Sequence, residues 1–342
     1  MGKMKAVGLY KHLSVEHPES LLDLEIDKPE ATGRDLLIEV KAISVNPVDT
    51  KIRKSKGEEE EEPKILGWDA AGVVVETGPE VTFFKQGDEV YYSGSVARQG
   101  TNSEFHLVDE RIAARKPESL GFKEAAAIPL TGITAWEALF ERLGYKAEKG
   151  GNKGVRMLII GAAGGVGSIA VQLASWAGFT VIGTASRPET ERWAREMGAD
   201  YLINHRESLS EQLKELDISE VDAIFCLNST AEHWEEMVQS IKPQGSICSI
   251  VETDQKIDLS MLQQKSGKFV WEFMFTRSLF ETDDMIKQRE ILSNLAQMLD
   301  EGTIRGTATE TLSPINAEKL KEAHRKLESG KTIGKITLES FE

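Results

Sequence analysis

Cysteine is scarce in this chain. Its 342 residues include only two, Cys226 and Cys248, and each lies in an apolar run that predicts a β-strand. We therefore expect two buried thiols rather than a disulfide. So low a cysteine content is typical of proteins from a reducing compartment, and it favours a cytoplasmic location.

Positive charge and long apolar runs are also in short supply. The chain has 41 lysines and arginines against 56 aspartates and glutamates, a net charge of −15. Nucleic acids and anionic membranes require clustered positive charge, so neither is expected as a partner. No run of about 18 apolar residues predicts a membrane span, and the N-terminus lacks the apolar core of a signal peptide. An anionic cofactor remains compatible with this balance, because it needs only a local basic pocket.

The first 128 residues contain short apolar runs separated by turn signals, which predict a mainly β fold. The turn signals include Gly33, Gly78-Pro79 and Gly87-Asp88. Between two of the runs stand five adjacent glutamates, residues 58–62, and because they repel one another we expect an exposed loop there. The predicted strands are Lys5–Leu9, Leu36–Ile43, Gly72–Glu76, Glu89–Tyr92 and Ser103–Val108.

From about residue 129 to residue 275, strands and helices alternate. Repeated strand–helix units predict an α/β fold with a doubly wound parallel sheet, covered by helices on both faces. We therefore expect two domains, residues 129–275 and residues 1–128 together with 276–342. The expected elements are strands Val155–Ile160, Thr180–Gly183, Tyr201–Ile203, Val221–Phe225, Ser246–Val251, Phe269–Phe275, 307–312 and 333–338, and helices 189–197, 231–241, 283–300 and 317–329.

A glycine-dense turn lies between the first strand and the first long helix of this alternating region. Apolar residues up to Ile160 predict the strand, Gly161–Gly167 the turn, and apolar residues from Val166 onward recur at helical spacing. In a Rossmann unit this arrangement binds a dinucleotide, because the backbone can approach the pyrophosphate and the helix N-terminus offers N–H groups. An ordinary strand–helix turn in another α/β protein is the alternative. The expected contacts are Ala163, Gly164, Gly165 and Val166.

The end of the second strand indicates which dinucleotide is bound. Sites that prefer NAD place Asp or Glu there, to accept hydrogen bonds from the ribose hydroxyls. Here Ser186 and Arg187 follow the strand, and no carboxylate occurs before Glu189. A hydroxyl and a guanidinium suit a 2′-phosphate, so NADPH is expected rather than NADH. The alternative is that Ser186 only caps the helix starting at Pro188 and that Arg187 is solvated.

Seven motifs, spread over nearly the whole chain, carry a family resemblance. They are Asn46–Asp49, Gly67–Val74, Gly87–Val90, Leu130–Trp136, Gly161–Gly167, Trp271–Arg277 and Gly330–Lys335. Together they resemble the medium-chain dehydrogenase/reductase superfamily, and in particular its quinone oxidoreductase branch. The motif Trp271–Arg277 is similar to a bacterial subgroup labelled zinc-type alcohol dehydrogenase-like. The resemblance implies a GroES-like β-rich catalytic domain, a Rossmann NADPH-binding domain, and a homodimer formed through edge strands of the latter.

The resemblance also raises the question of zinc. A catalytic zinc needs three protein ligands, usually Cys, His or a carboxylate. The resemblance places these ligands where this chain has Asn46, Trp68 and a residue near Ala127. Zinc-dependent relatives hold a structural zinc with four cysteines, whereas residues 91–128 of this chain contain none. An amide, an indole and a methyl group cannot build a zinc site, so no metal is expected.

Further cofactor contacts are implied by the resemblance. Thr131 would lie near the nicotinamide ribose or amide, and His205 stands where related quinone oxidoreductases have a Tyr near the 2′-phosphate. Strand-end packing is the alternative for such residues, and for Phe273 and Phe275 a core role and a place in the loop covering the nicotinamide weigh equally. The remaining expected contacts are Asn228 with Ser229 after the fourth strand, Val251 at the fifth, and Lys335 at a phosphate.

Without a metal, protein donors must stabilise the negative charge that hydride transfer places on a substrate oxygen. The candidates are Asn46, Lys51 and Tyr92, and for the last two a surface or packing role is equally compatible. We favour reduction of a quinone or an α,β-unsaturated carbonyl by an NADPH-dependent reductase. Reduction of a simple aldehyde or ketone is the second hypothesis. A catalytically weak NADPH-binding sensor or interaction protein is the third.

Overall fold

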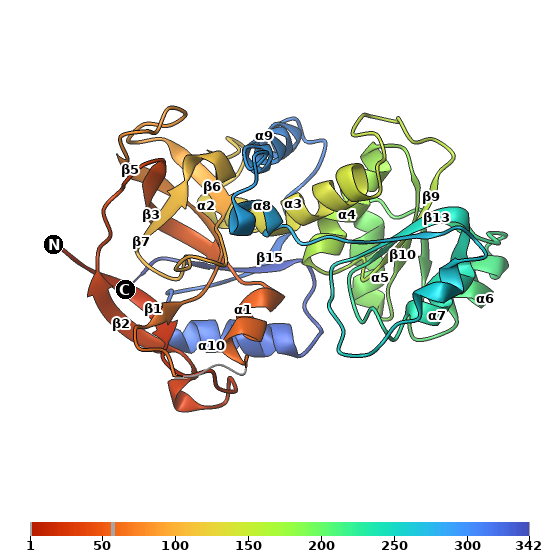
Figure 1. Cartoon of the computed structure of the whole chain (residues 1–342), viewed down its shortest axis with the longest axis horizontal. Coiled ribbons are helices and arrows are strands. Elements are labelled where there is room, and N and C mark those ends of the chain that lie inside the picture. Colours follow the sequence, from red (N-terminus) through yellow and green to blue (C-terminus); the bar gives the residue numbers. More distant parts are fainter. Residues whose placement is uncertain (1, 56–58, 342) are drawn as a thin grey trace. The chain divides into compact units, whose positions relative to one another are not determined.

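The computed structural model describes residues 2–55 and 59–341. Its contacts divide the chain into two compact units: unit 1 comprises Met1–Ile133 and Phe275–Glu342, and unit 2 comprises Thr134–Met274. Figure 1 labels their helices and strands in chain order. Over the described part of the chain, no helix combines the length and the apolar character needed to cross a membrane.

Unit 1 is built on two β-sheets. The larger has seven strands in the order β15-β16-β3-β5-β6-β8, with β7 also paired to β3, and the smaller has three in the order β2-β1-β4. Strand β3 pairs antiparallel with β5, β7 and β16 and is buried along most of its length, so it lies at the centre of this unit's core. The strands are β1 (Lys3–Leu9), β2 (Leu22–Asp27), β3 (Asp35–Ser44), β4 (Lys64–Ile65), β5 (Asp69–Thr77), β6 (Glu89–Ser93), β7 (Phe105–Asp109), β8 (Ala113–Arg115), β15 (Ala308–Leu312) and β16 (Lys335–Glu339).

Helices cover the sheets of unit 1. The longest, α9, packs on β8 through an apolar face that includes the buried Ile291 and Leu295. It begins later than the sequence predicts, because the Asp284 carboxylate accepts hydrogen bonds from Arg277 and Thr282 in the turn before it. The helices are η1 (Pro18–Ser20), α1 (Pro47–Arg53), η2 (Glu110–Ile112), α2 (Phe122–Ala126), α3 (Pro129–Trp136, which crosses into unit 2), α8 (Thr276–Phe280), α9 (Lys287–Asp300) and α10 (Ala317–Glu328).

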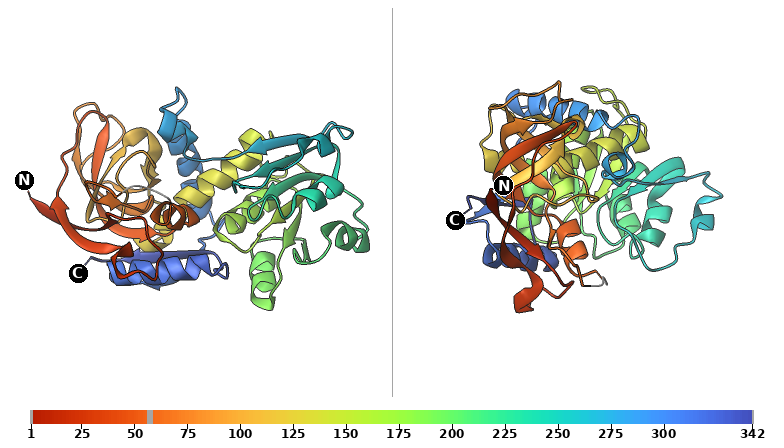
Figure 2. Two further views of the ribbon diagram at one scale, coloured as in Figure 1. Left: turned by 60° about the horizontal axis from the view of Figure 1, so that its bottom comes forward. Right: turned by 60° about the vertical axis from the view of Figure 1, so that its left-hand side comes forward.

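Helix α10 packs against α1, the helix that follows Asn46 (Figure 2). The contact contains the fully buried Arg53, whose Nε donates to Nδ1 of His324 over 3.1 Å and whose guanidinium pairs with Glu328. Burial and the adjacent arginine lower the pKa of His324 to about 3, so its ring stays neutral and can accept this bond. The pairing fixes α1, which carries the candidate Lys51.

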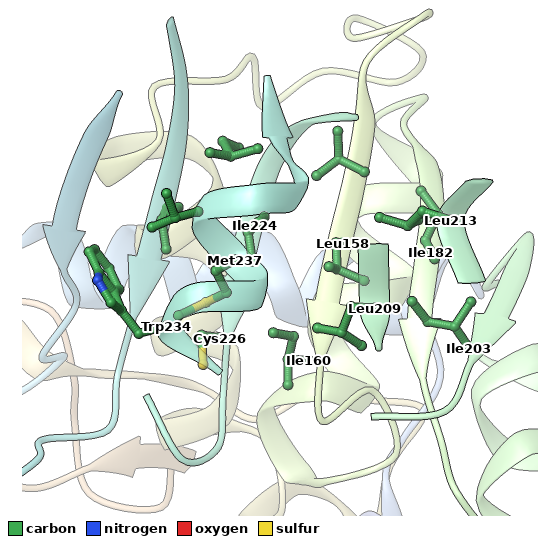
Figure 3. Close-up of a cluster of buried hydrophobic side chains, with 14 of the residues drawn as sticks. Leu158, Ile160, Ile182, Ile203, Leu209, Leu213, Ile224, Cys226, Trp234 and Met237 are labelled. Atoms are coloured by element: carbon green, nitrogen blue, oxygen red, sulfur yellow. The ribbon is translucent and has the colours of Figure 1, made fainter. Parts of the chain in front are cut away.

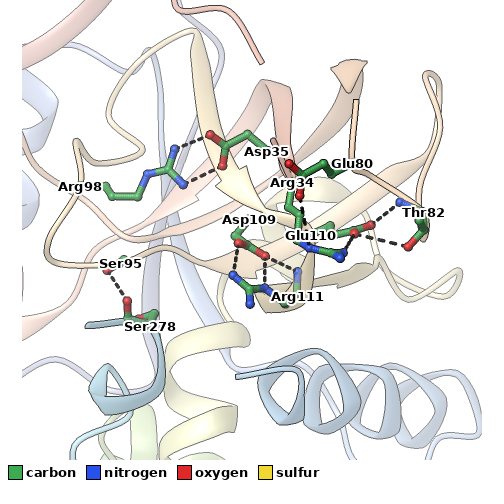
Figure 4. Close-up of polar contacts among 10 residues, drawn as sticks. All are labelled: Arg34, Asp35, Glu80, Thr82, Ser95, Arg98, Asp109, Glu110, Arg111 and Ser278. Carbon is green, nitrogen blue, oxygen red and sulfur yellow. Dashed lines mark hydrogen bonds and ion pairs between the residues drawn. The ribbon is translucent and has the colours of Figure 1, made fainter. Parts of the chain in front are cut away.

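Ion pairs tie together the loops around the larger sheet (Figure 4). Asp35 accepts two hydrogen bonds from Arg98, over 2.7 and 2.9 Å. The buried Glu110 accepts from Arg34 and from the backbone of Thr82, each over 2.8 Å. Of the five glutamates predicted to form an exposed loop, Glu58 lies outside the described part of the chain, as do residues 56 and 57. The other four glutamates, residues 59–62, are mostly exposed.

Unit 2 contains a six-stranded, wholly parallel sheet in the order β11-β10-β9-β12-β13-β14. The chain runs outward from β9 to β11 and then restarts on the other side of β9 with β12, so the strand order reverses there. In such sheets, ligands bind at the carboxyl ends of the strands beside the reversal. The strands are β9 (Arg156–Ile160), β10 (Thr180–Thr184), β11 (Tyr201–Ile203), β12 (Val221–Cys226), β13 (Ile241–Ser249) and β14 (Lys268–Trp271).

Both faces of this sheet are buried. Leu158, Ile160 and Ile224 pack with Leu213 of α6 and Met237 of α7 on one face (Figure 3). The intervening residues of β9 are also fully buried and point to the opposite face, because side chains alternate along a strand. This burial on both faces confirms the predicted doubly wound fold. The helices of unit 2 are the π-helix η3 (Glu137–Arg142), α4 (Gly165–Trp176), α5 (Pro188–Glu196), α6 (Leu209–Glu215), α7 (Trp234–Ser240) and η4 (Leu259–Leu262).

Candidate cofactor and substrate residues

The glycine-rich turn joins β9 to α4, as predicted. Gly161 has a φ of +92°, a conformation that other residues rarely adopt. A Cβ on Gly167 would come within 2.2 Å of the Gly161 carbonyl oxygen, so the first turn of α4 packs directly on the end of the strand. Both positions therefore require glycine.

Helix α4 presents its N-terminus at this turn. Gly164 is the N-cap, and no side chain caps the helix. Ala163 is buried, whereas Gly164, Gly165 and Val166 are partly exposed. Backbone N–H groups and the positive end of the helix dipole at such an end suit a pyrophosphate. The four residues expected to contact the cofactor thus lie together, and the close backbone approach fits a dinucleotide.

Ser186 and Arg187 follow the carboxyl end of β10, the neighbour of β9. Arg187 is the N-cap of α5, and the Thr190 hydroxyl accepts from its backbone N over 3.2 Å. The capping role that the sequence left open for Ser186 is therefore wrong. The Arg187 guanidinium lies 3.2 Å from Glu189 Oε1 in a partly exposed ion pair, which contributes little to stability and which a phosphate could displace.

His205 lies two residues beyond the end of β11 and faces a second histidine. The rings of His205 and His233 are edge to face with centroids 6.4 Å apart. His205 Nδ1 is buried and lacks a hydrogen-bond partner within the described residues. Burial lowers the pKa of both imidazoles and favours the neutral form; Arg206 adds to the shift of His205, whereas Glu232 and Glu236 oppose that of His233. His233 could not be predicted from the sequence, because it belongs to a different strand–helix unit.

Asn228 and Val251 lie in the loops that follow β12 and β13. The hydroxyl of Thr230 holds these loops together, because it contacts Ser249 Oγ over 2.6 Å and donates to the Val251 carbonyl over 2.5 Å. The Asn228 carbonyl accepts from the Cys226 thiol over 3.1 Å. At the carboxyl edge of the sheet, Asn228 is exposed and Val251 is partly exposed. Thr230 was not singled out from the sequence, although its place after β12 could have suggested it.

The two phenylalanines of the motif Trp271–Arg277 have different environments. Strand β14 ends at Trp271 rather than at Phe275, so the predicted strand is too long. Phe273 is 48% exposed in unit 2. Phe275 is buried in unit 1, where its ring lies edge to face with Trp68 at 6.2 Å. Phe273 is therefore accessible to a ligand, whereas Phe275 is a core residue of its unit.

A buried polar cluster in unit 1 contains Asn46 and Lys335. The Lys335 ammonium donates to Val45 O over 2.8 Å, to Asn46 Oδ1 over 2.5 Å and to Asp69 Oδ2 over 3.2 Å. Asn46 Nδ2 also donates to Asp69 Oδ2 over 2.8 Å, and Asp69 Oδ1 accepts from the Leu130 backbone over 2.7 Å. These three bonds use all three ammonium protons. A contact with a phosphate would therefore require Lys335 to break one of these hydrogen bonds.

Burial governs the ionisation of this cluster. It raises the pKa of Asp69 and lowers the pKa of Lys335, while the attraction between the two opposes both shifts. Asp49 accepts from the Asn46 backbone N over 2.8 Å, and burial raises its pKa to about 7. Its second oxygen lacks a hydrogen-bond partner in the described structure. Asp69 joins three segments here, and sequence reasoning did not assign it a role.

The other candidates of unit 1 differ in accessibility. Lys51 is exposed on α1. Tyr92 is fully buried, its hydroxyl lies 2.9 Å from His106 Nδ1, and burial raises its pKa. Thr131 is buried in α3 and its hydroxyl donates to backbone carbonyls of the preceding turn, Ala127 among them. Of the proposed donors, Lys51 is exposed, whereas Asn46 and Tyr92 are buried.

Two family profiles match this chain. That of the alcohol dehydrogenase GroES-like domain matches residues 32–134, and that of zinc-binding dehydrogenases matches residues 197–338. A zinc-type alcohol dehydrogenase-like protein of Staphylococcus epidermidis is 42% identical over 98% of this chain and 99% of its own length. The chain belongs to the medium-chain dehydrogenase/reductase superfamily. As a member it is an oxidoreductase, and the resemblance drawn from the seven motifs is confirmed.

Solved structures of medium-chain dehydrogenases/reductases share the fold. A putative zinc-dependent alcohol dehydrogenase from Rhizobium etli CFN 42 is 46% identical, covers 100% of this chain and 99% of its own, and has a TM-score of 0.95. The Escherichia coli quinone oxidoreductase, solved in complex with NADPH, is 27% identical, covers 98% of this chain and 99% of its own, and has a TM-score of 0.82. These likenesses confirm the GroES-like and Rossmann-type architecture.

The name of the second profile implies zinc, but the residues of this medium-chain dehydrogenase/reductase do not fit it. Asn46 is bonded to Asp69 and Lys335, and the Trp68 indole donates to Ser95 O over 2.9 Å. An ammonium beside Asn46 would repel a divalent cation. Within residues 2–55 and 59–341, no group of three or more His, Cys, Asp or Glu side chains has the geometry of a metal site.

Proposed function

We propose that the protein is an NADPH-dependent, zinc-independent reductase that transfers hydride to a quinone or an α,β-unsaturated carbonyl. The observation that carries the proposal is the donor set around Asn46. Three ligands of Cys, His or carboxylate type are needed for a catalytic zinc. Here an amide and an indole stand at two of the ligand positions, a methyl group stands near the third, and a lysine ammonium is bonded to the amide.

The cofactor would be held by unit 2. The Gly161–Gly167 turn and the N-terminus of α4 would receive the pyrophosphate, and Arg187 with Ser186 and His205 the 2′-phosphate. When bound, the reduced nicotinamide supplies a hydride. The quinone oxidoreductase of Escherichia coli, whose structure contains NADPH, supports this assignment. The exposed Asn228 and Phe273 and the partly exposed Val251 would contact the nicotinamide half.

The state of the unit 1 donors favours a quinone or an enone. The side-chain NH2 group of Asn46 already donates to Asp69, and its side-chain oxygen accepts from Lys335. Tyr92 is buried, with its hydroxyl bonded to His106. A quinone or an enone spreads the developing charge over a conjugated system and can take its proton from solvent. A simple carbonyl concentrates that charge on one oxygen and needs a strong donor. Lys51, which is exposed on α1, would polarise a substrate oxygen.

A substrate panel tests the proposal. Purified protein is mixed with NADPH or NADH and with quinones, enones or simple aldehydes, and kcat/KM is measured for each pair. The proposal predicts turnover of quinones or enones with preference for NADPH. Turnover confined to aldehydes would support the alcohol dehydrogenase alternative. Tight NADPH binding without turnover would support a sensor or interaction protein.

The assembly would be a homodimer. Strand β14 is an edge strand of the six-stranded sheet, and its last residue, Trp271, is 48% exposed. An edge strand with an exposed indole can pair with a second copy of itself. Light scattering is expected to give the mass of two chains, and a monomer would contradict this part of the proposal.

The cytoplasm is the proposed location, since the two thiols, both buried, form no disulfide.

A further inference from the structure

A buried acid pair with one arginine lies at the end of β14 in unit 2. Glu272 is 2% exposed, and neither of its carboxylate oxygens receives a hydrogen bond of good geometry from the described residues. Glu137 is fully buried beside it. Arg142 contacts both acids: its Nε lies 2.9 Å from Glu272 Oε2, and its Nη2 lies 3.3 Å from Glu137 Oε2. The proposed function assigns no role to these residues.

A π-helix brings Glu137 and Arg142 together. In the segment Glu137–Arg142 the Leu143 backbone N donates to the Ala138 carbonyl, five residues back, over 2.9 Å. This winding aligns residues five apart, whereas an α-helix aligns residues three or four apart. Arg142 therefore lies over Glu137 and can also reach Glu272. Single π-turns of this kind occur frequently at functional sites.

One arginine cannot neutralise two buried carboxylates. Burial, together with the charge of Glu137, raises the pKa of Glu272 to about 9. Two further titratable groups face the pair: Glu141, whose carboxylate lies 3.7 Å from Arg142, and Cys248 on β13, whose own pKa is raised by burial. A proton on one acid removes the repulsion and lets that acid donate to the other. Such a proton would supply the well-aligned hydrogen bond that the Glu272 oxygens lack among the described residues.

We propose that Glu137 and Glu272 share a single proton, and that this pair, with Arg142, anchors the chain where it leaves β14. Trp271 before the anchor and Phe273 after it are each 48% exposed. Glu272 itself continues the sheet, because its backbone N donates to Ser249 O over 2.9 Å. Glu272 is then a positioning residue for Phe273. Its effect on cofactor binding rests on the proposed function, whereas the shared proton does not.

The pair has a measurable effect on stability. In the unfolded chain a glutamate has a pKa near 4.5, and in the fold the pKa of Glu272 is about 9, so the native state holds one extra proton between these values. The stabilisation is complete below the lower value and is lost progressively up to the higher one. One proton of difference raises the unfolding constant about tenfold per pH unit.

Chemical denaturation of the wild type and of Glu272→Gln tests this. Gln can still donate a hydrogen bond to Glu137 but cannot titrate. Between about pH 6 and pH 8 the wild-type unfolding constant should rise about a hundredfold relative to that of the variant. Equal pH slopes for the two proteins would mean that the pair holds no such proton, and would overturn the proposal.

Three further variants make the test specific. Glu141→Gln removes a partly exposed carboxylate beside the same arginine and should keep the wild-type slope. Glu137→Gln should flatten the slope as Glu272→Gln does, since the remaining acid can then pair ionised with Arg142, and it replaces Glu272→Gln if that variant does not fold. The double variant of Glu137 and Glu272 deprives Arg142 of both acids, and should lose more stability than the two single variants together.

A second readout concerns the cofactor. Above about pH 9 the wild type loses the proton, the anchor carries an unpaired negative charge, and the dissociation constant for NADPH should rise. The constant of Glu272→Gln should not show this rise. Superimposable pH profiles would contradict the positioning role. A wild type that binds NADPH at no pH would instead contradict the proposed function, so the two failures are distinguishable.

Discussion

At the residue scale, the character of the substrate region follows from which polar groups are already bonded. Lys335 and Asn46 satisfy each other and Asp69 inside unit 1, and Tyr92 is bonded to His106. A family position that could hold a metal ion is thus surrounded by an internal network with its own cation. The candidate Lys51, by contrast, is exposed on α1.

Replacing Lys335 by Met tests this network. Asp69 would keep a buried charge without its cation, and breaking a buried pair in this way costs about 3–5 kcal/mol of stability. The pKa of Asp69 would rise further, so the variant should bind an extra proton at low pH and its deficit should grow as the pH rises. Urea denaturation at two pH values measures this, with the exposed Lys331→Met as control. A small, pH-independent deficit would contradict the network.

Replacing Arg187 by Ala tests the assignment of the cofactor. Losing a charge-assisted hydrogen bond to the 2′-phosphate should weaken NADPH binding by about 1.5–3 kcal/mol, roughly 10- to 100-fold, while NADH binding changes little. Titration calorimetry with both cofactors measures the difference. Arg192→Ala, an exposed arginine on the same helix, is the matched control. Equal losses for NADPH and NADH would show that Arg187 does not contact the phosphate.

The sequence was sufficient for residues whose role depends on local pattern. Gly161 and Gly167 could be predicted because a tight strand–helix turn requires a positive φ or a close backbone approach, and both requirements favour glycine. The bonds of Lys335 and the pairing of His205 with His233 could not, because each joins segments that are distant in the chain. The same holds for Glu137 and Glu272. Amphipathic spacing does not reveal which buried acids will meet.

At the scale of elements, patterns located strands and helices but not always their ends. Strand β14 ends at Trp271, and the next residue, Glu272, still bonds to Ser249 O through its backbone N and contacts Arg142 through its side chain, a contact that an apolar run cannot indicate. Strand β13 begins at Ile241, earlier than predicted, because Ile241 already pairs with Val221 of β12, and the register shifts before Ser246 pairs with Ala223. The π-helix Glu137–Arg142 has the composition of an α-helix, and its winding was not predictable.

Gly167→Ala tests the strand–helix turn. The new Cβ would lie 2.2 Å from a backbone oxygen, which cannot move cheaply, so a loss of about 1–3 kcal/mol in stability and weaker cofactor binding are expected. In Gly164→Ala the new Cβ would lie 3.5 Å from the same oxygen, an ordinary contact, so its stability should change little. Thermal denaturation compares the two variants. Equal stability of the two variants would mean that the Gly161 carbonyl does not pack against Gly167 as closely as 2.2 Å implies.

At the scale of the whole molecule, the motifs were more informative than composition. A net charge of −15 led only to an expectation about partners, whereas the seven motifs identified the superfamily and both parts of its fold. Substrate and assembly could not be derived in the same way, because they depend on side chains that differ among members with one backbone. They remain proposals based on the donor set around Asn46 and on the edge strand β14.

We propose that this oxidoreductase transfers hydride to its substrate without zinc. The direct measurement is the metal content of the purified protein, combined with its NADPH-dependent quinone or enone turnover before and after dialysis against a chelator. The zinc content is expected to be far below one ion per chain, and turnover is expected to survive dialysis unchanged. Stoichiometric zinc, with turnover that disappears on chelation and returns when zinc is restored, would contradict it.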